Sequence, residues 1–347
     1  MTETSPRPRR GTDFKPPRLS GTTDKAAHRL RRDQCHRYYP VPDASHSLDA
    51  KTAFISTRPW SFTMTFSSVT MGTLMAAIAG RFTPMIYLLT LAGMIAFHAA
   101  TNVLNDYFDV RHGVDRDGAP TTKYRLHPAA VGETRLSTVL AISLALYALT
   151  LAAGFYLASI SGVSIVLVIG AGILGSVLYT ADPVVLKAHA LGEATVFVMW
   201  GLLIPAGAFM VQTGYFSWSP LVAALPIGLF VALVLLANNI RDIGYDGSVR
   251  TRTLAVALGA AKSEKLYSIL LALAYALVLG GIVGRLLPIW SVAVLLTLPV
   301  ARRLAGMFKG QIPDNADPRT AALALQFSLL YMASLLLSLF LPLSLPT

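Results

Sequence analysis

Long apolar stretches recur along the chain from about position 61 to the C-terminus, and polar segments separate them. Each stretch holds roughly 20 residues, the length that an α-helix needs to cross the hydrocarbon core of a bilayer. The pattern therefore predicts an all-α, polytopic membrane protein with nine transmembrane helices. The expected spans are 61–80, 85–105, 137–158, 161–180, 191–212, 220–239, 266–285, 288–307 and 320–345.

The segments between these spans alternate in charge, and this alternation predicts how the chain crosses the membrane. Of the 29 Lys and Arg residues, 27 lie in the N-terminal segment or after the second, fourth, sixth and eighth spans. Only Arg81 and Arg285 fall on the other side. Because positive residues concentrate on the cytoplasmic side, we expect a multi-pass protein of the cell (inner) membrane. Its N-terminus would be cytoplasmic and its C-terminus outside.

The N-terminal residues differ from the rest, so we divide the chain into a basic tail (1–55) and a membrane domain (56–347). The tail is rich in Arg, Pro, Ser, Thr and Asp and lacks the apolar core of a cleavable signal peptide. Such a composition cannot bury enough surface to fold alone, so we expect a disordered cytoplasmic extension. It could touch anionic lipid, although an extension without function is the simpler interpretation.

Composition supports a membrane protein and argues against other classes. The chain is 54% hydrophobic and 14% charged, whereas soluble domains carry about 25% charged residues. A net charge of +11 could indicate nucleic acid, but the charges follow the predicted topology, so we expect no nucleic-acid partner. The single Cys35 excludes an internal disulfide and any multi-cysteine metal site.

Two short polar motifs, at residues 102–109 and 238–246, end the second and sixth spans. Each begins with Asn and places Asp four residues later. On a helix, Asn102, Asp106 and Asp109 share one face, and so do Asn238, Asp242 and Asp246. Carboxylates at a membrane boundary are costly and mark functional sites. Both motifs lie on the predicted cytoplasmic side, so we expect one site built from two helices. The structural alternative is a pair of solvated loops whose Asp and Asn cap helices.

The density of negative charge in these motifs predicts a divalent cation. Asp115 and Asp117 follow the first motif, and we expect too few adjacent bases to pair the four motif carboxylates. Mg²⁺ would relieve their repulsion, and it prefers one or two carboxylates together with substrate phosphate. A phosphorylated substrate that spans both motifs through Mg²⁺ is therefore the natural inference.

Basic residues follow both motifs and suit a diphosphate, whose charge exceeds what one cation neutralises. Lys123 and Arg125 follow the first motif, Arg252 follows the second, and Lys187 lies alone after the fourth span. The positive-inside bias is the competing explanation for each of them. His98 shares a helix face with Asn102, and we expect a hydrogen-bonded helix histidine there. His112, His127 and His189 have spacings that do not suit a metal site.

At these residues the chain resembles the UbiA superfamily of membrane prenyltransferases. Residues 105–115, Asn-Asp-Tyr-Phe-Asp-Val-Arg-His-Gly-Val-Asp, match its first Asp-rich motif, and residues 239–246 match its second. Arg58-Pro59, Tyr179-Thr180 and Leu186-Lys187 are also typical, as is Leu191-Gly192-Glu193. The second motif, Asn-Asn-x-Arg-Asp-x-x-x-Asp, looks most like the MenA branch, which prenylates 1,4-dihydroxy-2-naphthoate in menaquinone biosynthesis. Arg252 departs from this pattern, because Lys is common there.

The resemblance implies a UbiA-like helical bundle and Mg²⁺-dependent transfer of a polyprenyl group from polyprenyl diphosphate to an aromatic acceptor. It implies that Asp106, Asp109, Asp242 and Asp246 are the catalytic and metal-binding residues. The implied substrate-binding residues are Asn102, Asn105, Asp115, Lys123, Arg125, Tyr179, Lys187, Asn238, Asn239, Arg241 and Arg252. Another UbiA-type prenyltransferase, acting on a different quinone or on a haem, chlorophyll or lipid precursor, is the main alternative. A transporter is a further one, although its ion site would lie at midspan.

Overall fold

The computed structural model describes residues 50–249, 251–309 and 312–341, and these ranges are almost entirely helical. The all-α membrane fold predicted from the apolar pattern is confirmed. The elements are α2 (Ala50–Ser56), η2 (Pro59–Ser61), α3 (Phe62–Ile78), α4 (Pro84–Arg111), α5 (Pro120–Tyr124), α6 (Leu136–Ser161), α7 (Ser164–Thr180), η3 (Leu186–Ala188), α8 (Gly192–Val198), η4 (Met199–Leu203), α9 (Ile204–Thr213), α10 (Ser219–Arg241), α11 (Ile243–Ser248), α12 (Leu254–Leu258), α13 (Ala260–Val283), η5 (Ile289–Thr297), α14 (Leu298–Met307) and α15 (Ala316–Ser338).

Each of the nine predicted spans contains a helix among the described residues, and eight of these helical segments are long and apolar enough to cross a membrane. Helix α7, in the predicted span 161–180, is shorter, at 17 residues. α4 extends to Arg111, beyond the predicted end of the span, so the whole first motif is helical. Helix α2 covers the last residues of the segment assigned to the tail, and the rest of that segment lies outside the described residues.

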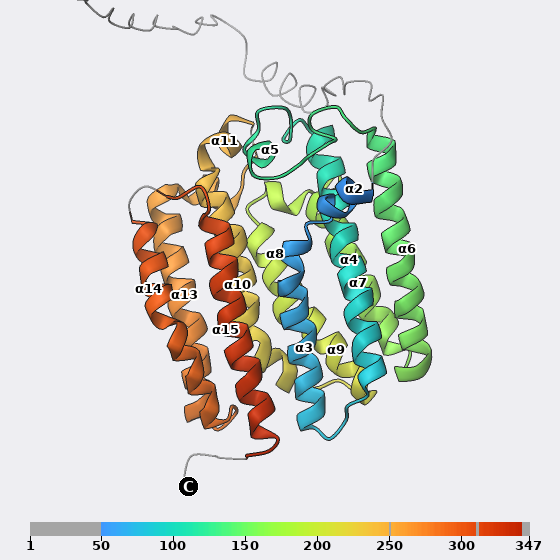
Figure 1. Cartoon of the computed structure of the whole chain (residues 1–347), viewed down its shortest axis with the longest axis vertical. Coiled ribbons are helices and arrows are strands. Elements are labelled where there is room, and N and C mark those ends of the chain that lie inside the picture. Colours follow the sequence, from blue (N-terminus) through green and yellow to red (C-terminus); the bar gives the residue numbers. More distant parts are fainter. Residues whose placement is uncertain (1–49, 250, 310–311, 342–347) are drawn as a thin grey trace, which may run out of the picture. The chain divides into compact units, whose positions relative to one another are not determined.

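The long helices run side by side, and the short helices α2, α5 and α11 lie together at one end of the bundle (Figure 1). Helix α15 ends at the opposite end. Helix α10 is the most buried of the spanning helices described, because α3, α13, α15 and η4 pack around it. The second motif therefore begins on the central helix of the bundle.

A close approach between two glycines sets how α10 packs against the α8–η4–α9 segment. A Cβ added at Gly228 would lie 2.5 Å from the Cα of Gly201, so only glycine fits at this crossing. Gly201 lies in η4, a π-helical turn that follows α8. This packing brings the start of α8 against the end of α10, where the second motif lies.

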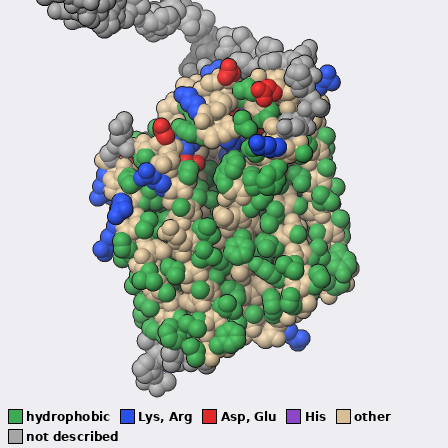
Figure 2. Space-filling view, viewed as in Figure 1, with side chains coloured by type: hydrophobic (Ala, Val, Ile, Leu, Met, Phe, Trp, Pro, Cys, Tyr) green, Lys and Arg blue, Asp and Glu red, His purple; other side chains and the backbone are tan. Residues whose placement is uncertain are grey.

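Side chains on the flank of the bundle are mostly hydrophobic, whereas charged side chains gather toward the end that carries the short helices (Figure 2). Large apolar side chains such as Leu149, Phe155 and Leu167 on the spanning helices are more than half exposed. An exposed apolar surface of this extent is what lipid would cover. The chain is therefore a multi-pass membrane protein, with its motif-bearing end outside the apolar belt.

Candidate active site

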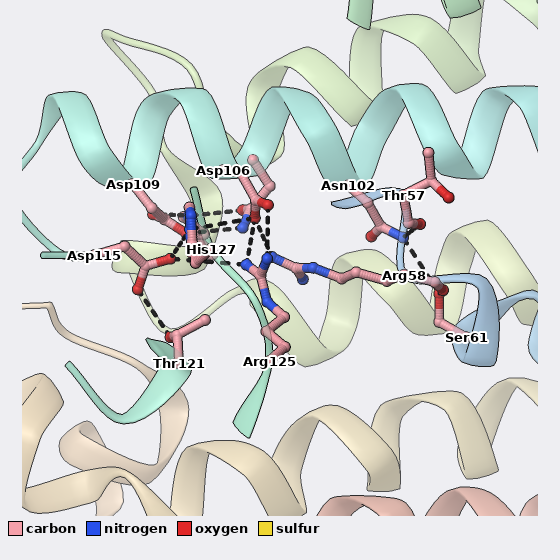
Figure 3. A network of polar contacts seen from close by, with 12 residues as sticks. Thr57, Arg58, Ser61, Asn102, Asp106, Asp109, Asp115, Thr121, Arg125 and His127 are labelled. Atoms are coloured by element: carbon pink, nitrogen blue, oxygen red, sulfur yellow. Dashed lines mark hydrogen bonds and ion pairs between the residues drawn. The ribbon is translucent and has the colours of Figure 1, made fainter. Parts of the chain in front are cut away.

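The first motif lies on a single helix, as its spacing predicts. Asn102, Asp106 and Asp109 all belong to α4, and both carboxylates are buried. Asn102 donates from Nδ2 to the carbonyl oxygen of Thr57 at 2.9 Å and to the hydroxyl of Ser61 at 3.2 Å (Figure 3). These bonds attach the segment before α3 to the start of the motif.

Asp106 is bound by two arginines that come from opposite sides in sequence. Arg125 donates from Nη1 to Oδ2 at 2.9 Å and from Nη2 to Oδ1 at 2.6 Å. Arg58, just before η2, also donates to Oδ1 (Figure 3). Bidentate arginine–carboxylate pairs fix geometry and are among the stronger ion pairs. Arg125 was predicted as a site residue, but Arg58 was noted only as part of a typical dipeptide.

Asp115 and His127 extend this cluster. His127 Nε2 lies 3.0 Å from Asp115 Oδ2, and Thr121 donates to Asp115 Oδ1 at 2.8 Å. Burial opposes the charge on Asp115, but the hydrogen bond and charge of His127 lower its pKa below the usual value. The expectation that the spacing of His127 does not suit a metal site was wrong, because the loop folds back. Ligand atoms of Asp106, Asp115 and His127 lie within 4.8 Å of one another.

Asp109 pairs with Lys187, which the chain delivers from η3. Lys187 Nζ contacts Asp109 Oδ1 and donates to Asn105 Oδ1 at 2.6 Å. Asn105 in turn donates to Asp109 Oδ2 at 2.7 Å. The Lys187 ammonium also lies 6.0 Å from the ring centroid of Tyr179. Four predicted site residues are thus brought together from three separate segments.

The second motif is not one continuous helix, and the prediction that its residues share a single helical face was wrong. Helix α10 ends at Arg241, and Asp242 has φ −95° and ψ 8°, which separates α10 from α11. Arg241 forms several polar contacts at this break. Arg241 donates from Nε and Nη2 to both oxygens of Asp242, at 2.9 and 2.7 Å, and from Nη2 to Asn238 at 2.7 Å. It also pairs with Asp317 on α15.

Asp246, on α11, is the motif carboxylate without an ion pair in the described ranges. Its Oδ2 accepts a hydrogen bond from the Thr253 hydroxyl at 3.4 Å. Burial and the negative charge of Asp242 raise the pKa of Asp246 to about 7, and Asp109 adds to this effect. The Tyr245 hydroxyl donates to the carbonyl oxygen of Val114 at 2.7 Å, and this contact places the two motifs beside each other.

The expectation of too few nearby bases was therefore wrong for three of the four carboxylates. Asp106 and Asp109 have basic partners that are distant in sequence, and Asp242 pairs with its neighbour Arg241. Two predicted basic residues are not part of these pairs. The side chains of Lys123 and Arg252 are exposed, and neither forms an ion pair with the motif carboxylates in the ranges described. The backbone of Arg252 instead accepts a hydrogen bond from Ala190 at 2.9 Å.

Two further buried residues adjoin the site. Asn239 donates from Nδ2 to Oε1 of Glu193 at 2.9 Å, and both side chains are buried. Glu193 was noted in sequence only as part of a typical tripeptide.

His98 is a hydrogen-bonded helix histidine, as expected, because its Nδ1 lies 2.8 Å from Thr65 Oγ1. It lies one turn below Asn102 and contacts Trp200 edge-on.

The donor set fits a hard divalent cation. The end of α4 and the α10–α11 junction carry four carboxylates and several amide oxygens at one end of the bundle, and these oxygen ligands are the ones Mg²⁺ prefers. Three carboxylates are held by arginine or lysine, so a cation that binds them would release those basic groups. The released groups could then bind an anion beside the cation. The arrangement therefore suits a metal-bound diphosphate.

Comparison with known proteins agrees with this chemistry. Residues 65–330 match the model of the UbiA prenyltransferase family. The UbiA prenyltransferase domain-containing protein 1 of Homo sapiens is 30% identical over 329 residues, which cover 92% of this chain and 94% of that protein. The Gallus gallus protein of the same name is 31% identical, with coverage of 82% and 84%.

Solved structures show the same fold. A UbiA homolog from Aeropyrum pernix K1 aligns with a TM-score of 0.60 at 20% identity, covering 80% of this chain and 98% of that one. A UbiA homolog from Archaeoglobus fulgidus bound to GPP and Mg²⁺ aligns with a TM-score of 0.58 at 16% identity, covering 82% and 99%. These matches do not single out the MenA branch. They do show that the chain belongs to the UbiA prenyltransferase family.

Proposed function

We propose that this prenyltransferase uses Mg²⁺ to transfer a polyprenyl group from polyprenyl diphosphate to an aromatic acceptor. The observation that carries the proposal is the pairing of three motif carboxylates with Arg125, Lys187 and Arg241 at one end of the bundle. Such a set holds both the ligands for a cation and the charges for a diphosphate. The Archaeoglobus fulgidus homolog bound to GPP and Mg²⁺ supports the same pairing of ligands.

The four motif carboxylates, Asp106, Asp109, Asp242 and Asp246, would hold Mg²⁺, with Asn102 and Asn239 orienting the shell. When bound, Mg²⁺ supplies positive charge that stabilises the departing diphosphate. Arg58, Arg125 and Lys187 would bind the diphosphate oxygens that the cation leaves uncovered. Because Asp246 has a pKa of about 7 without a cation, its proton would compete with Mg²⁺ near neutral pH.

The reaction breaks the bond between C1 of the prenyl group and its diphosphate oxygen, and a carbon of the aromatic ring bonds to C1. The developing allylic cation must be kept from water, which would quench it. The buried residues below the motifs, including His98 and Trp200, provide such a dry environment. The prenyl tail would extend between helices toward lipid.

We further propose that the acceptor is 1,4-dihydroxy-2-naphthoate, as in menaquinone biosynthesis. Support comes from the second motif, in which Asn238, Asn239, Arg241 and Asp242 follow the MenA-like order. A dihydroxylated ring is electron-rich enough to capture an allylic cation. Attack at the carbon that bears the carboxylate, with loss of CO₂, restores aromaticity and leaves the hydroxyl groups in place.

Parallel assays with two labelled acceptors test this assignment. Purified protein would receive a prenyl diphosphate and either 1,4-dihydroxy-2-naphthoate or 4-hydroxybenzoate. We expect a prenylated naphthalene product, with CO₂ and diphosphate released in equal amounts. Prenylation of hydroxybenzoate alone would contradict the assignment of the acceptor, but it would still support the wider prenyltransferase activity. No transfer to any aromatic acceptor would contradict the proposed function itself.

A further inference from the structure

Glu193 is a buried carboxylate whose two oxygens differ sharply. It lies in the first turn of α8 and is 4% exposed. Oε1 accepts the hydrogen bond from Asn239, whereas Oε2 is buried and has no hydrogen-bond partner among the described residues. Buried polar atoms in native structures are nearly always paired, so an unpaired one points to a partner outside the chain.

The position of Glu193 suits a substrate contact. Asn239 precedes Asp242 by three residues on the same chain segment, which is about 4.5 Å along a helix axis toward the bundle interior. Glu193, bonded to Asn239, therefore lies one level deeper than the second carboxylate cluster. Gly192, the neighbour of Glu193, packs against Lys187, because a Cβ added there would lie 3.5 Å from the Lys187 Cα. Lys187 pairs with Asp109, which connects this level to the first cluster.

We propose that Oε2 of Glu193 accepts a hydrogen bond from a ring hydroxyl of the aromatic acceptor and so orients the ring toward the prenyl group. This inference rests on the proposed function. A diphosphate held at the level of the carboxylates places its C1 carbon deeper in the bundle, because the tail leaves toward the apolar interior. The attacking ring must lie at that depth, and its hydroxyl needs an acceptor there.

The hydrogen bond from Asn239 decides which oxygen of Glu193 is available to a ligand. The Nδ2 group of Asn239 fixes Oε1, which leaves Oε2 as the free atom of the pair. A buried site that hydrogen-bonds a substrate hydroxyl discriminates strongly against analogues that lack it. Glu193 would therefore be a specificity-determining residue for hydroxylated rings.

The test compares binding of acceptor analogues that differ by one hydroxyl. For a dihydroxynaphthoate acceptor these are 2-naphthoate, 1-hydroxy-2-naphthoate and 4-hydroxy-2-naphthoate, measured as competitive inhibitors of the acceptor. In the wild-type protein we expect one of the two hydroxyls to tighten inhibition by about 10- to 150-fold, the range for a charge-assisted hydrogen bond. If neither hydroxyl tightens inhibition, the proposal is overturned.

Two variants assign that gain to Glu193. Glu193→Gln keeps an oxygen for Asn239 and turns the free oxygen into an NH₂ donor. Glu193→Leu removes both oxygens. It is needed because the introduced glutamine amide and the Asn239 amide could both flip, which would leave an oxygen facing the acceptor. We expect the gain to fall to about threefold or less in Glu193→Leu. The KM for prenyl diphosphate should stay unchanged in Glu193→Gln, which keeps the bond to Asn239. Exposed Glu133 supplies the matched control, Glu133→Gln.

The outcomes separate this inference from the proposed function. If the wild type prenylates an aromatic acceptor and both variants keep the full hydroxyl gain, only the role of Glu193 is contradicted. Should Glu193→Leu fail to fold, Glu193→Gln decides, because its unchanged KM for prenyl diphosphate reports an intact site. A wild type that transfers to no aromatic acceptor would instead contradict the proposed function.

Discussion

Arg125 binds both carboxylate oxygens of Asp106, at 2.6 and 2.9 Å, although the two residues belong to different elements of the site. Asp106 lies on α4, whereas Arg125 follows α5, so this pair ties the loop to the helix. In the proposed reaction the same guanidinium must serve two partners in turn. It binds Asp106 when no cation is present, and it binds the diphosphate when the cation is bound.

Replacing Arg125 tests this dual role. Charge-assisted contacts are worth about 1.5–3 kcal/mol each, so Arg125→Ala should raise the KM for prenyl diphosphate or lower kcat by about 10- to 150-fold in all. Arg125→Lys should lose the bidentate geometry, and its kinetic defect should lie between those of the wild type and Arg125→Ala. Steady-state kinetics with varied prenyl diphosphate measure the effect, and exposed Arg302 gives the control Arg302→Ala. A change confined to the acceptor KM would contradict the assignment.

Lys187 should matter most when no cation is present. In Lys187→Met, Asp109 keeps its hydrogen bond from Asn105 but loses Lys187, the cation with which it pairs among the described residues. A buried charge left unpaired is destabilising, so the apparent unfolding temperature in EDTA should fall. Mg²⁺ together with a non-reactive prenyl thiodiphosphate should restore part of the loss, because the cation replaces the ammonium. If the unfolding temperature falls equally with and without these ligands, the cation does not take the position of the Lys187 ammonium.

Tyr124 anchors the loop that carries Arg125. Its ring lies 4.2 Å from the guanidinium carbon of Arg241, which is itself paired with Asp242 and Asp317. Cation–π contacts contribute about 0.5–2 kcal/mol, so Tyr124→Ala should raise the KM for prenyl diphosphate by about 2- to 30-fold. Tyr124→Phe keeps the ring and should behave like the wild type. If the two variants are equally impaired, the hydroxyl and not the ring is responsible.

The proposed orientation is testable with fusion reporters. The distribution of Lys and Arg, 27 against 2, predicts a cytoplasmic N-terminus and an external C-terminus. A C-terminal alkaline phosphatase should be active, and a C-terminal fluorescent protein should be dark. The same reporters placed in the segment between α4 and α6 should behave in the opposite way. The reverse pattern would remove the cytoplasmic assignment of both motifs.

Periodicity and charge were sufficient to predict the helices and the first motif, because both depend on neighbours along the chain. Asn102, Asp106 and Asp109 share α4 as their spacing requires. The second motif was harder, because Arg241 pairs with its neighbour Asp242 and with Asp317 from α15, and the helix breaks there. That contact joins residues far apart in sequence, and local spacing carries no signal for it.

The same limit explains the residues that sequence reasoning left out of the site. Arg58 and His127 reach the first cluster through folding of the segment before α3 and of the loop after α5. Glu193 reaches Asn239 because the Gly201–Gly228 crossing lets two helices approach closely. A buried acidic residue inside an apolar span is the one signal that could have marked Glu193 in advance.

The central claim is that the motif carboxylates act through a divalent cation to transfer a prenyl group. Its most direct test is prenyl transfer by the purified protein, measured with and without Mg²⁺ for Asp106→Asn, Asp242→Asn and the exposed control Asp117→Asn. We predict Mg²⁺-dependent transfer by the wild type and by Asp117→Asn, and no transfer by the two motif variants although both insert and purify. Near-normal transfer by Asp106→Asn and Asp242→Asn in EDTA would contradict the account.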